Sequence, residues 1–339
     1  MKVVTFGEIM LRLEPEGYYR FVQVDKMTST FGGAEANVAV SLANFGIESY
    51  YVTKLPSHEI GQAAVNALRR YGVHTEYVAR GGERIGIYYN ERGASQRGSK
   101  CIYDRLHSSI AEAVPCDFDW KKIFAECKWF HITGITPALG GKMTDICIEA
   151  CKAAKDAGAV VSCDLNYRSK LWSAEQARDA LTKICKYVDV CIANEEDAKN
   201  VFGIEAEGTD VAKGQMNKDA YKSVAKQLAE RFGFEKVAFT LRTSINANEN
   251  KWAALLYDGK EYYFSKEYEM FVVDRVGGGD SFSAGLIYSL LNGKSPAQTV
   301  EFAAAASCLK HSIEGDWNMV SVDEVEKLAG GNASGRIQR

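Results

Sequence analysis

The sequence predicts an α/β protein with three layers, in which helices cover both faces of a mostly parallel sheet. Two observations predict this fold class. Short apolar segments of strand length alternate with segments of helix length over most of the 339 residues. Two other stretches, at about 11–31 and 84–105, contain only strand-like segments and fit a small separate sheet. We therefore expect one domain over 1–329 with this small sheet beside it, and a frayed tail at 330–339.

The chain begins with a buried strand at 2–9, and Gly7 near its end would let a ligand approach the backbone closely. Residues 21–24 alternate in polarity and are expected to form a strand, whereas Gly32-Gly33 introduces a helix that Gly46 closes. Further strands are expected at 49–55, 85–90, 100–105, 129–133, 160–164, 188–193, 237–241, 252–257 and 261–265. Further helices are expected at 60–71, 143–157, 174–186, 195–202, 219–232, 281–291, 297–310 and 322–328.

Two connecting segments have their own signals. Asp258-Gly259 lies between two strand segments and is a strong hairpin turn. The polar stretch 205–217 is expected to be a surface loop.

Composition excludes several classes of partner. The formal net charge of −3 and the pI near 6.1 provide no general attraction to nucleic acid or to an anionic membrane. No apolar stretch approaches the length of a membrane span or of a signal-peptide core. The nine cysteines include no C-x-x-C pair and several lie in apolar runs, which favours reduced, buried thiols. We expect a cytoplasmic protein.

The most informative stretch is Gly277-Gly278-Gly279-Asp280, which precedes a long apolar helix. Glycines allow a tight loop, and the first amides of a helix together with its dipole favour an anion. Asp280, directly behind them, could accept a proton from a hydroxyl held in front of the loop. The alternative is a solvent-exposed loop that ends in a helix cap, and the stretch alone does not separate the two interpretations.

A second glycine loop allows a comparison with known families. Gly32-Gly33-Ala34-x-x-Asn37 near the start and Asp274-x-x-Gly277-Gly278-Gly279-Asp280 near the end resemble the two ordered motifs of the ribokinase-like (PfkB-type) carbohydrate kinases. The resemblance covers nearly the whole chain. Within this family the chain looks most like the 2-keto-3-deoxygluconate kinases, because of Gly7-Glu8, Tyr103-x-Arg105 and the sequence Asp-Leu-Asn-Tyr-Arg at 164–168.

The resemblance implies a ribokinase-like three-layer α/β/α sandwich with a small β-sheet lid. It also implies transfer of the γ-phosphoryl group of ATP, with Mg²⁺, to the 6-hydroxyl of 2-keto-3-deoxygluconate. Asp280 would then be the general base, and the amides of Gly277, Gly278 and Gly279 would stabilise the charge on the transferred group. Gly33 would let the sugar lie against the backbone, and Asn37 would contact a sugar hydroxyl.

An acid sugar also requires a partner for its carboxylate. Arg168 and Arg105 occupy the matching family positions, although each arginine could instead form an ordinary ion pair. Tyr103 and one residue of the adjacent pair Tyr88-Tyr89 would add phenolic donors. Only one of that pair can face the sugar, and Tyr89 is the predicted one. Asp316 is a further candidate contact for the sugar.

On the nucleotide side, the resemblance suggests Asn194, Thr240 and Arg242 as contacts. Asp197 matches the position of an acidic residue that acts near Mg²⁺, commonly through water. The same acidic segment could simply be the first turn of a helix capped by Asn194. Arg275 departs from the small residue usual after Asp274, which leaves open whether the monovalent-cation site of some relatives exists here.

Two other hypotheses remain at this point. The sugar could be fructose, ribose or keto-deoxygalactonate, and the protein could also be a sugar-binding homologue without catalysis. Binding alone does not need a base such as Asp280 behind the three glycines, which argues against the last hypothesis. No Walker motif and no G-x-G-x-x-G after the first strand is present, so a Walker-type ATPase or a dinucleotide-dependent dehydrogenase is not expected. Exposed lid strands also make a homodimer through the lid plausible.

Overall fold

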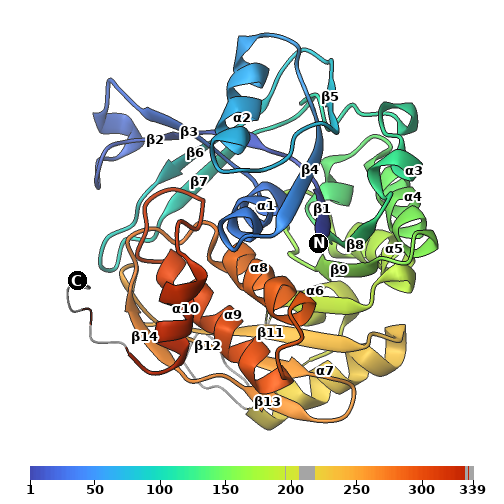
Figure 1. Ribbon diagram of the computed structural model, residues 1–339. Helices are drawn as coiled ribbons and strands as arrows, with labels where there is room; N and C mark the ends of the chain where they lie inside the picture. Colours follow the sequence, from blue (N-terminus) through green and yellow to red (C-terminus); the bar gives the residue numbers. More distant parts are fainter. Residues whose placement is uncertain (195, 206–217, 333–334, 336–339) are drawn as a thin grey trace.

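The computed structural model describes residues 1–194, 196–205, 218–332 and 335. Within them, a mixed sheet runs through the centre of the molecule in the order β13-β12-β11-β10-β9-β8-β1-β4-β5, with β14 paired to β12 (Figure 1). The parallel part contains β1 (Lys2–Phe6), β4 (Glu48–Leu55), β5 (Val78–Arg80), β8 (Cys127–Thr133), β9 (Val160–Asp164), β10 (Val190–Ala193) and β11 (Lys236–Ser244). The antiparallel edge contains β12 (Glu249–Tyr257), β13 (Tyr262–Phe264) and β14 (Tyr268–Phe271).

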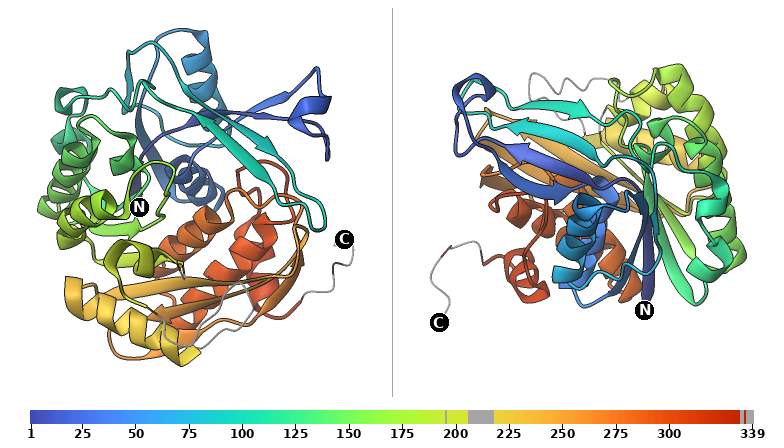
Figure 2. Two further views of the ribbon diagram at one scale, coloured as in Figure 1. Left: turned by 180° about the vertical axis from the view of Figure 1, so that it is seen from behind. Right: turned by 90° about the horizontal axis from the view of Figure 1, so that it is seen from above.

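Helices cover both faces of this sheet, because its strands are apolar on both sides (Figures 1 and 2). One face packs against α3 (Trp120–Ile123), α4 (Met143–Asp156), α5 (Ala174–Ile184), α6 (Asp197–Phe202) and α7 (Lys218–Phe232). The other face packs against α1 (Ala34–Asn44), α2 (Glu59–Arg70), α8 (Gly278–Leu291), α9 (Pro296–Lys310) and α10 (Val322–Ala329). The predicted three-layer α/β architecture is therefore confirmed.

A second, smaller sheet lies beside the first. Its order is β3-β2-β6-β7, and it is built from β2 (Met10–Glu14), β3 (Thr28–Gly32), β6 (Gly86–Glu91) and β7 (Lys100–Asp104). Figure 2 shows it extending from the side of the large sheet. These strands come from the two stretches that the sequence assigns to a small sheet.

Several local predictions need correction. Residues Phe21–Gln23 form a 3-10 helix, not a strand, since the segment is a connection between β2 and β3 and has no partner strand there. The strands β5 and β14 and the short helix α3 were not predicted. The predicted hairpin at Asp258-Gly259 is confirmed by the pairing of β12 with β13. The predicted loop at 205–217 and the predicted tail lie mostly outside the described residues.

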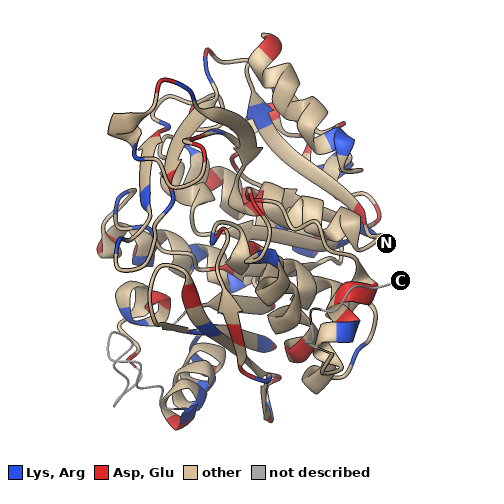
Figure 3. Cartoon of the chain, turned by 90° about the vertical axis from the view of Figure 1, so that its left-hand side faces the viewer, with Lys and Arg blue, Asp and Glu red and all other residues tan. Residues whose placement is uncertain are grey.

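Three properties of the structure relate to the composition of the chain: helix apolarity, the distribution of charge and the burial of cysteines. In the described part of the chain, no helix combines the length and apolarity that a membrane crossing requires. Basic and acidic residues are interspersed over the side drawn in Figure 3. Six of the nine cysteines are buried, Cys101 and Cys308 are partly exposed and Cys116 is exposed, and all nine are free thiols.

Helices α8 and α9 pack unusually close together, because a glycine faces a run of alanines. A Cβ atom placed on Gly285 would lie 2.9 Å from the Cα of Ala303 and 3.3 Å from the Cβ of Ala306. Ala303 and Ala306 are fully buried, so neither can move away into solvent. This packing fixes α8, whose first turn carries the glycine loop and Asp280.

The substitution Gly285→Val should therefore destabilise the protein. Overpacking of a close helix contact costs about 1–3 kcal/mol, which exceeds the small gain in helix propensity over glycine. The free energy of unfolding from urea denaturation measures the effect. Gly98→Ala is the matched control, because a Cβ on Gly98 meets nothing within 4 Å. Equal unfolding free energies for both variants would show that the helices can separate without cost.

Candidate active site

A cavity of about 500 Å³ lies at the carboxyl ends of the parallel strands, between them and the small sheet. Segments far apart in the chain line it, from the start of α1 to the loop after α9. All but two of the predicted site residues line the cavity: Gly33, Asn37, Tyr103, Arg105, Arg168, Asn194, Thr240, Arg242, Gly277, Gly278, Gly279, Asp280 and Asp316. The two that do not line it are Tyr89 and Asp197.

The first turn of α8 places the glycine run in the cavity. Gly277 is the N-cap and has a φ of 83°, a left-handed conformation that favours glycine. A Cβ on Gly277 would also lie 2.0 Å from the carbonyl oxygen of Asp316, so any larger residue would displace this loop. The opening amides of an α-helix lack partners within the helix, and its dipole is positive at this end. The loop therefore offers hydrogen-bond donors to an anion.

Asp280 follows these glycines, in the first turn of the same helix. Its burial, opposed by a hydrogen bond from Asn37 and assisted by the charges of Asp316 and Glu35, raises the pKa of the Asp280 carboxyl to about 7. The amide nitrogen Nδ2 of Asn37 donates to Oδ2 of Asp280 at 2.7 Å. The Asp280 carboxyl can thus exchange a proton near neutral pH, as a general base must.

Asn37 joins the two glycine loops. While its Nδ2 contacts Asp280, its Oδ1 accepts a hydrogen bond from the backbone N–H of Gly33 at 3.2 Å. A Cβ on Gly33 would lie 2.0 Å from the carbonyl oxygen of Glu8, which explains why glycine stands at this position. The start of α1 and the start of α8 are therefore held together at the reacting end of the cavity.

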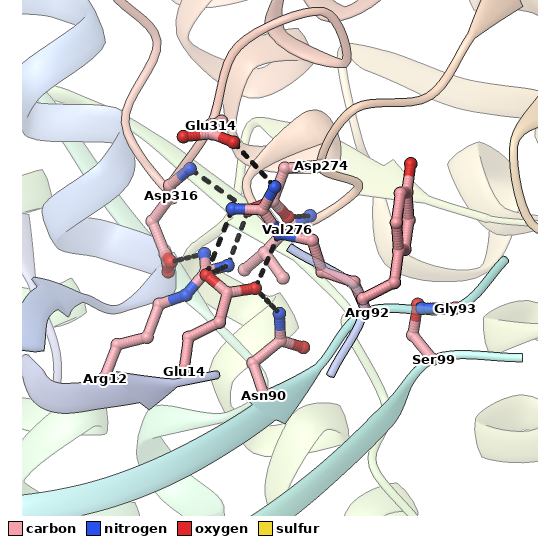
Figure 4. A network of polar contacts seen from close by, with 12 residues as sticks. Arg12, Glu14, Asn90, Arg92, Gly93, Ser99, Asp274, Val276, Glu314 and Asp316 are labelled. Atoms are coloured by element: carbon pink, nitrogen blue, oxygen red, sulfur yellow. Dashed lines mark hydrogen bonds and ion pairs between the residues drawn. The ribbon is translucent and has the colours of Figure 1, made fainter. Parts of the chain in front are cut away.

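Asp316 enters the cavity from a network of buried charges (Figure 4). Arg12 on β2 is fully buried and contacts Asp316 at 2.6 Å, Glu14 at 2.6 Å and Asp274 at 2.5 Å. Arg92 at the end of β6 contacts Glu14 and Glu314 at 2.8 Å each. The network joins the small sheet to the loop before α8, which contains Asp274, and to the loop after α9, which contains Glu314 and Asp316.

The tyrosine prediction for the small sheet selects the wrong neighbour. Tyr88 lines the cavity and its hydroxyl donates to Oδ1 of Asp316, whereas Tyr89 is outside the lining and packs against Phe21. Strand alternation places these side chains on opposite faces, but it does not say which face is turned to the cavity. Burial and the nearby Asp316 charge raise the pKa of Tyr88 well above its usual value, so its hydroxyl stays protonated.

The two predicted arginines have different surroundings. Arg105 is buried, and both its Nε and its Nη2 donate to Oε2 of Glu8, with the Nε contact at 2.7 Å. Its guanidinium also lies 5.3 Å from the ring centre of Tyr103. Arg168 is exposed to the cavity and forms no salt bridge to a residue that the structure describes. Of the two, Arg168 is the one whose charge is available to a ligand.

Asp197 has a different role from the predicted one. Its carboxylate accepts hydrogen bonds from the backbone N–H groups of Tyr167 and Asn194, both at 3.0 Å, and only 2% of the residue is exposed. Burial raises the pKa of Asp197 to about 6. The neighbouring Glu196 lines the cavity instead. The side chain of Asn194 caps this turn by accepting from the N–H of Glu196 at 2.8 Å.

Several lining residues were missed as site candidates, and three of them are Arg275, Asp164 and Glu196. Arg275 lines the cavity near Arg242, and its pKa is lowered by burial and by the Arg242 charge. Neither arginine forms a salt bridge to any residue within the described ranges. Burial and the charges of Asp197 and Asp280 raise the pKa of Asp164 well above its usual value. A local signal was present in the sequence, since Arg275 lies two residues before Gly277 and Asp164 begins the Asp-Leu-Asn-Tyr-Arg sequence.

Comparisons with known proteins agree with this geometry. Residues 1–320 match the profile of the family described as pfkB family carbohydrate kinase. A 2-dehydro-3-deoxygalactonokinase of Haloferax volcanii is 32% identical over 98% of each chain. The crystal structure of a 2-dehydro-3-deoxygluconokinase from Thermotoga maritima superposes with a TM-score of 0.95, at 51% identity over 98% of this chain and 100% of that one.

A more distant structure shares the fold. A putative ribokinase II of E. coli, in complex with ATP and Mg²⁺, has a TM-score of 0.80 and 20% identity over 97% of this chain and 99% of that one. Together with the match over residues 1–320, the two glycine loops, Asp280 and the small sheet lead to one conclusion. The chain belongs to the pfkB family of carbohydrate kinases.

Proposed function

We propose that this kinase transfers the γ-phosphoryl group of ATP to the 6-hydroxyl of 2-keto-3-deoxygluconate. One observation carries the proposal: the same cavity contains Asp280 at the start of α8 and the exposed guanidinium of Arg168. The first supports phosphoryl transfer to a hydroxyl, and the second would give a sugar carboxylate a bidentate partner. The Thermotoga relative, at 51% identity, is named for this activity.

In the proposed reaction, the sugar hydroxyl lies beside Asp280, which takes its proton as the oxygen attacks phosphorus. The hydrogen bond from Asn37 holds the Asp280 carboxylate in one orientation. The amides of Gly277, Gly278 and Gly279 stabilise the negative charge on the phosphoryl oxygens. Positioning and charge stabilisation supply most of the rate acceleration in this kind of transfer.

The sugar is proposed to lie between α1 and the small sheet. Gly33 allows it to approach the backbone, and Asp316, fixed by Arg12 and Tyr88, accepts a hydrogen bond from a hydroxyl. Arg168 binds the carboxylate. Arg105 is oriented by Glu8 and contributes its remaining donors at the cavity wall.

The triphosphate is proposed to lie along Thr240, Arg242 and Arg275. Two neighbouring arginines without salt bridges to described residues form a cationic surface that a triphosphate would neutralise. Mg²⁺ bound with ATP would neutralise charge on the phosphate oxygens, and Glu196 provides carboxylate oxygens of the type it prefers at this end of the cavity. Asp197 is not proposed as a ligand, because backbone amides occupy its oxygens.

One alternative substrate has specific support. The Haloferax relative is named for keto-deoxygalactonate, which differs from the proposed sugar at one hydroxyl. The proposed contacts with the carboxylate and the 6-hydroxyl would serve both epimers equally. A kinase for fructose or ribose would leave the charge of Arg168 without a partner.

Other features stay predictions. The small sheet is proposed to act as a lid on a single domain, in a cytoplasmic enzyme. A homodimer through this lid is also proposed, because the edge strand β7 exposes Ile102 and the residue Leu106 follows it, with 53% and 75% of their surfaces accessible.

A substrate panel tests the proposed function. Coupled assays with ATP should give higher kcat/KM for keto-deoxygluconate or keto-deoxygalactonate than for fructose or ribose. The substitution Arg168→Met should raise KM for the acid sugar by about 10- to 100-fold, the range expected for a lost charged hydrogen bond. It should change KM for fructose only slightly.

Arg84→Met is the matched control for this panel. Arg84 is partly exposed and pairs with Asp104, and it is not among the lining residues of the cavity. Its replacement should leave both KM values unchanged. Equal kcat/KM for fructose and the acid sugars in the wild-type enzyme would refute the acid-sugar assignment.

The general base is tested by Asp280→Asn. This change should lower kcat by about 100- to 10,000-fold, while sugar affinity stays within about tenfold of wild type. Single-turnover rates and sugar binding by calorimetry separate the two effects. The exposed Asp323 in α10 offers the control Asp323→Asn, which should retain full activity. Normal turnover in Asp280→Asn would exclude the proposed role.

The pH dependence follows from the same carboxyl. Its pKa is raised from 3.8 to about 7, so the group already gains a proton as pH falls through neutrality. A protonated carboxyl cannot act as base, and kcat/KM should therefore fall about tenfold per pH unit below about pH 7. The profile is measured at saturating ATP. A rate that stays constant down to about pH 5 would mean that another group accepts the proton.

A further inference from the structure

Lys310, the last residue of α9, is a buried cation that the reaction scheme does not yet use. None of its surface is accessible, which is rare for lysine unless its charge is paired. The ammonium donates to two backbone carbonyl oxygens, that of Asp274 at 3.3 Å and that of Ile313 at 3.2 Å. It forms no salt bridge with a carboxylate among the residues described. Its partners are therefore main-chain atoms of the two loops beside the cavity.

The position of this side chain relates it to the anion-binding loop. A Cβ on Gly277 would lie 3.3 Å from the Cε of Lys310, so the lysine stem passes directly behind the N-cap of α8. Asp274 begins the segment that leads to this cap. Its carboxylate is held from the other side by Arg12 (Figure 4). Arg12 thus holds the carboxylate of Asp274, and Lys310 holds the backbone carbonyl oxygen of the same residue.

We propose that Lys310 is a positioning residue for phosphoryl transfer, a built-in cation that holds the loop before Gly277 and adds positive charge behind the anion-binding amides. The inference rests on the proposed role of these amides. It concerns how they are held and charged, whichever sugar accepts the phosphoryl group.

Two physical arguments support this role. Carbonyl oxygens carry partial negative charge, and two of them buried behind a phosphate site would weaken it unless a cation engages them. A fixed positive charge at low dielectric costs no reorganisation during the reaction, and such charges act strongly on developing phosphoryl charge.

The surroundings of Lys310 act on its charge in opposite directions. Burial lowers the pKa of Lys310, while the charges of Asp274, Asp316 and Asp280 raise it and that of Arg12 lowers it. These carboxylates offset part of the burial penalty without forming a direct ion pair. The ammonium is therefore shared between main-chain oxygens and is not neutralised by one acid.

The test replaces the ammonium and then supplies a substitute. Lys310→Met keeps the length of the side chain and removes its charge, and should lower kcat by about 100-fold, the cost of losing one stabiliser of transition-state charge. KM for the sugar should change far less, since Lys310 is not a lining residue. In Lys310→Ala, added ammonium or methylammonium chloride should restore part of the lost kcat, whereas sodium chloride at equal ionic strength should not.

A matched control exists at the other end of the sheet. Lys2 is also buried, with 9% of its surface accessible, and its ammonium donates to the carbonyl oxygen of Ala125 and to Tyr77, both at 3.1 Å. Lys2→Met should lose stability without losing kcat. If Lys310→Met does not fold, Lys310→Gln takes its place in the test. Glutamine keeps a hydrogen-bond donor for the two carbonyl oxygens but carries no charge. The same loss of kcat is expected for it.

The outcomes are distinct. Wild-type kcat in folded Lys310→Met or Lys310→Gln overturns the proposal, and so does a loss in Lys310→Ala that ammonium ions do not relieve. Thermal melting of each variant establishes that it is folded. The assay uses whichever sugar the wild-type enzyme phosphorylates best, so a wrong assignment of the sugar leaves this test valid.

Discussion

The buried guanidinium of Arg12 is the interaction on which the site depends. It contacts Asp274 and Asp316, which lie 262 and 304 positions further along the chain, as well as Glu14 on its own strand. A buried charge is costly unless it is paired, and three carboxylates without the arginine would repel one another. The small sheet and the loops beside α8 and α9 can therefore take their places only together. The active site is consequently a product of both ends of the chain.

The arginines in and around the cavity fall into two groups, those that form ion pairs within the protein and those that do not. Arg12 and Arg105 are paired with buried carboxylates and fix the shape of the wall. Arg168, Arg242 and Arg275 face the cavity without a salt bridge to any described residue. An unpaired guanidinium next to a cavity gains a counter-ion only from a ligand, and the reaction brings two, the sugar carboxylate and the triphosphate. The unpaired arginines thus support the proposed positions of the sugar carboxylate and the triphosphate.

Local patterns in the sequence sufficed for most of the fold, but not for side-chain direction or distant partners. Apolar periodicity and glycine positions predicted nearly all helices and parallel strands, and the two glycine loops located the cavity. Alternation could not decide between Tyr88 and Tyr89, since it fixes opposite faces without saying which one is buried. Asp197 occupied a plausible ligand position, but backbone amides nearby bind its carboxylate. The contacts of Lys310 are equally invisible in sequence, because neither carbonyl partner carries a residue signature.

The three glycines of the loop have different surroundings. Gly277 has a left-handed backbone and touches the carbonyl of Asp316, and a Cβ on Gly278 would lie 2.3 Å from the ring of His311. These two glycines let the end of α9 and the segment that follows it pack against the start of α8. A Cβ on Gly279 meets no atom within 4 Å, so protein packing does not exclude a side chain there. The space beside Gly279 is open to the cavity, since Gly279 is exposed whereas Gly277 and Gly278 are buried. The three glycines look alike in the sequence, but packing against the protein restricts Gly277 and Gly278, whereas Gly279 is open to the cavity.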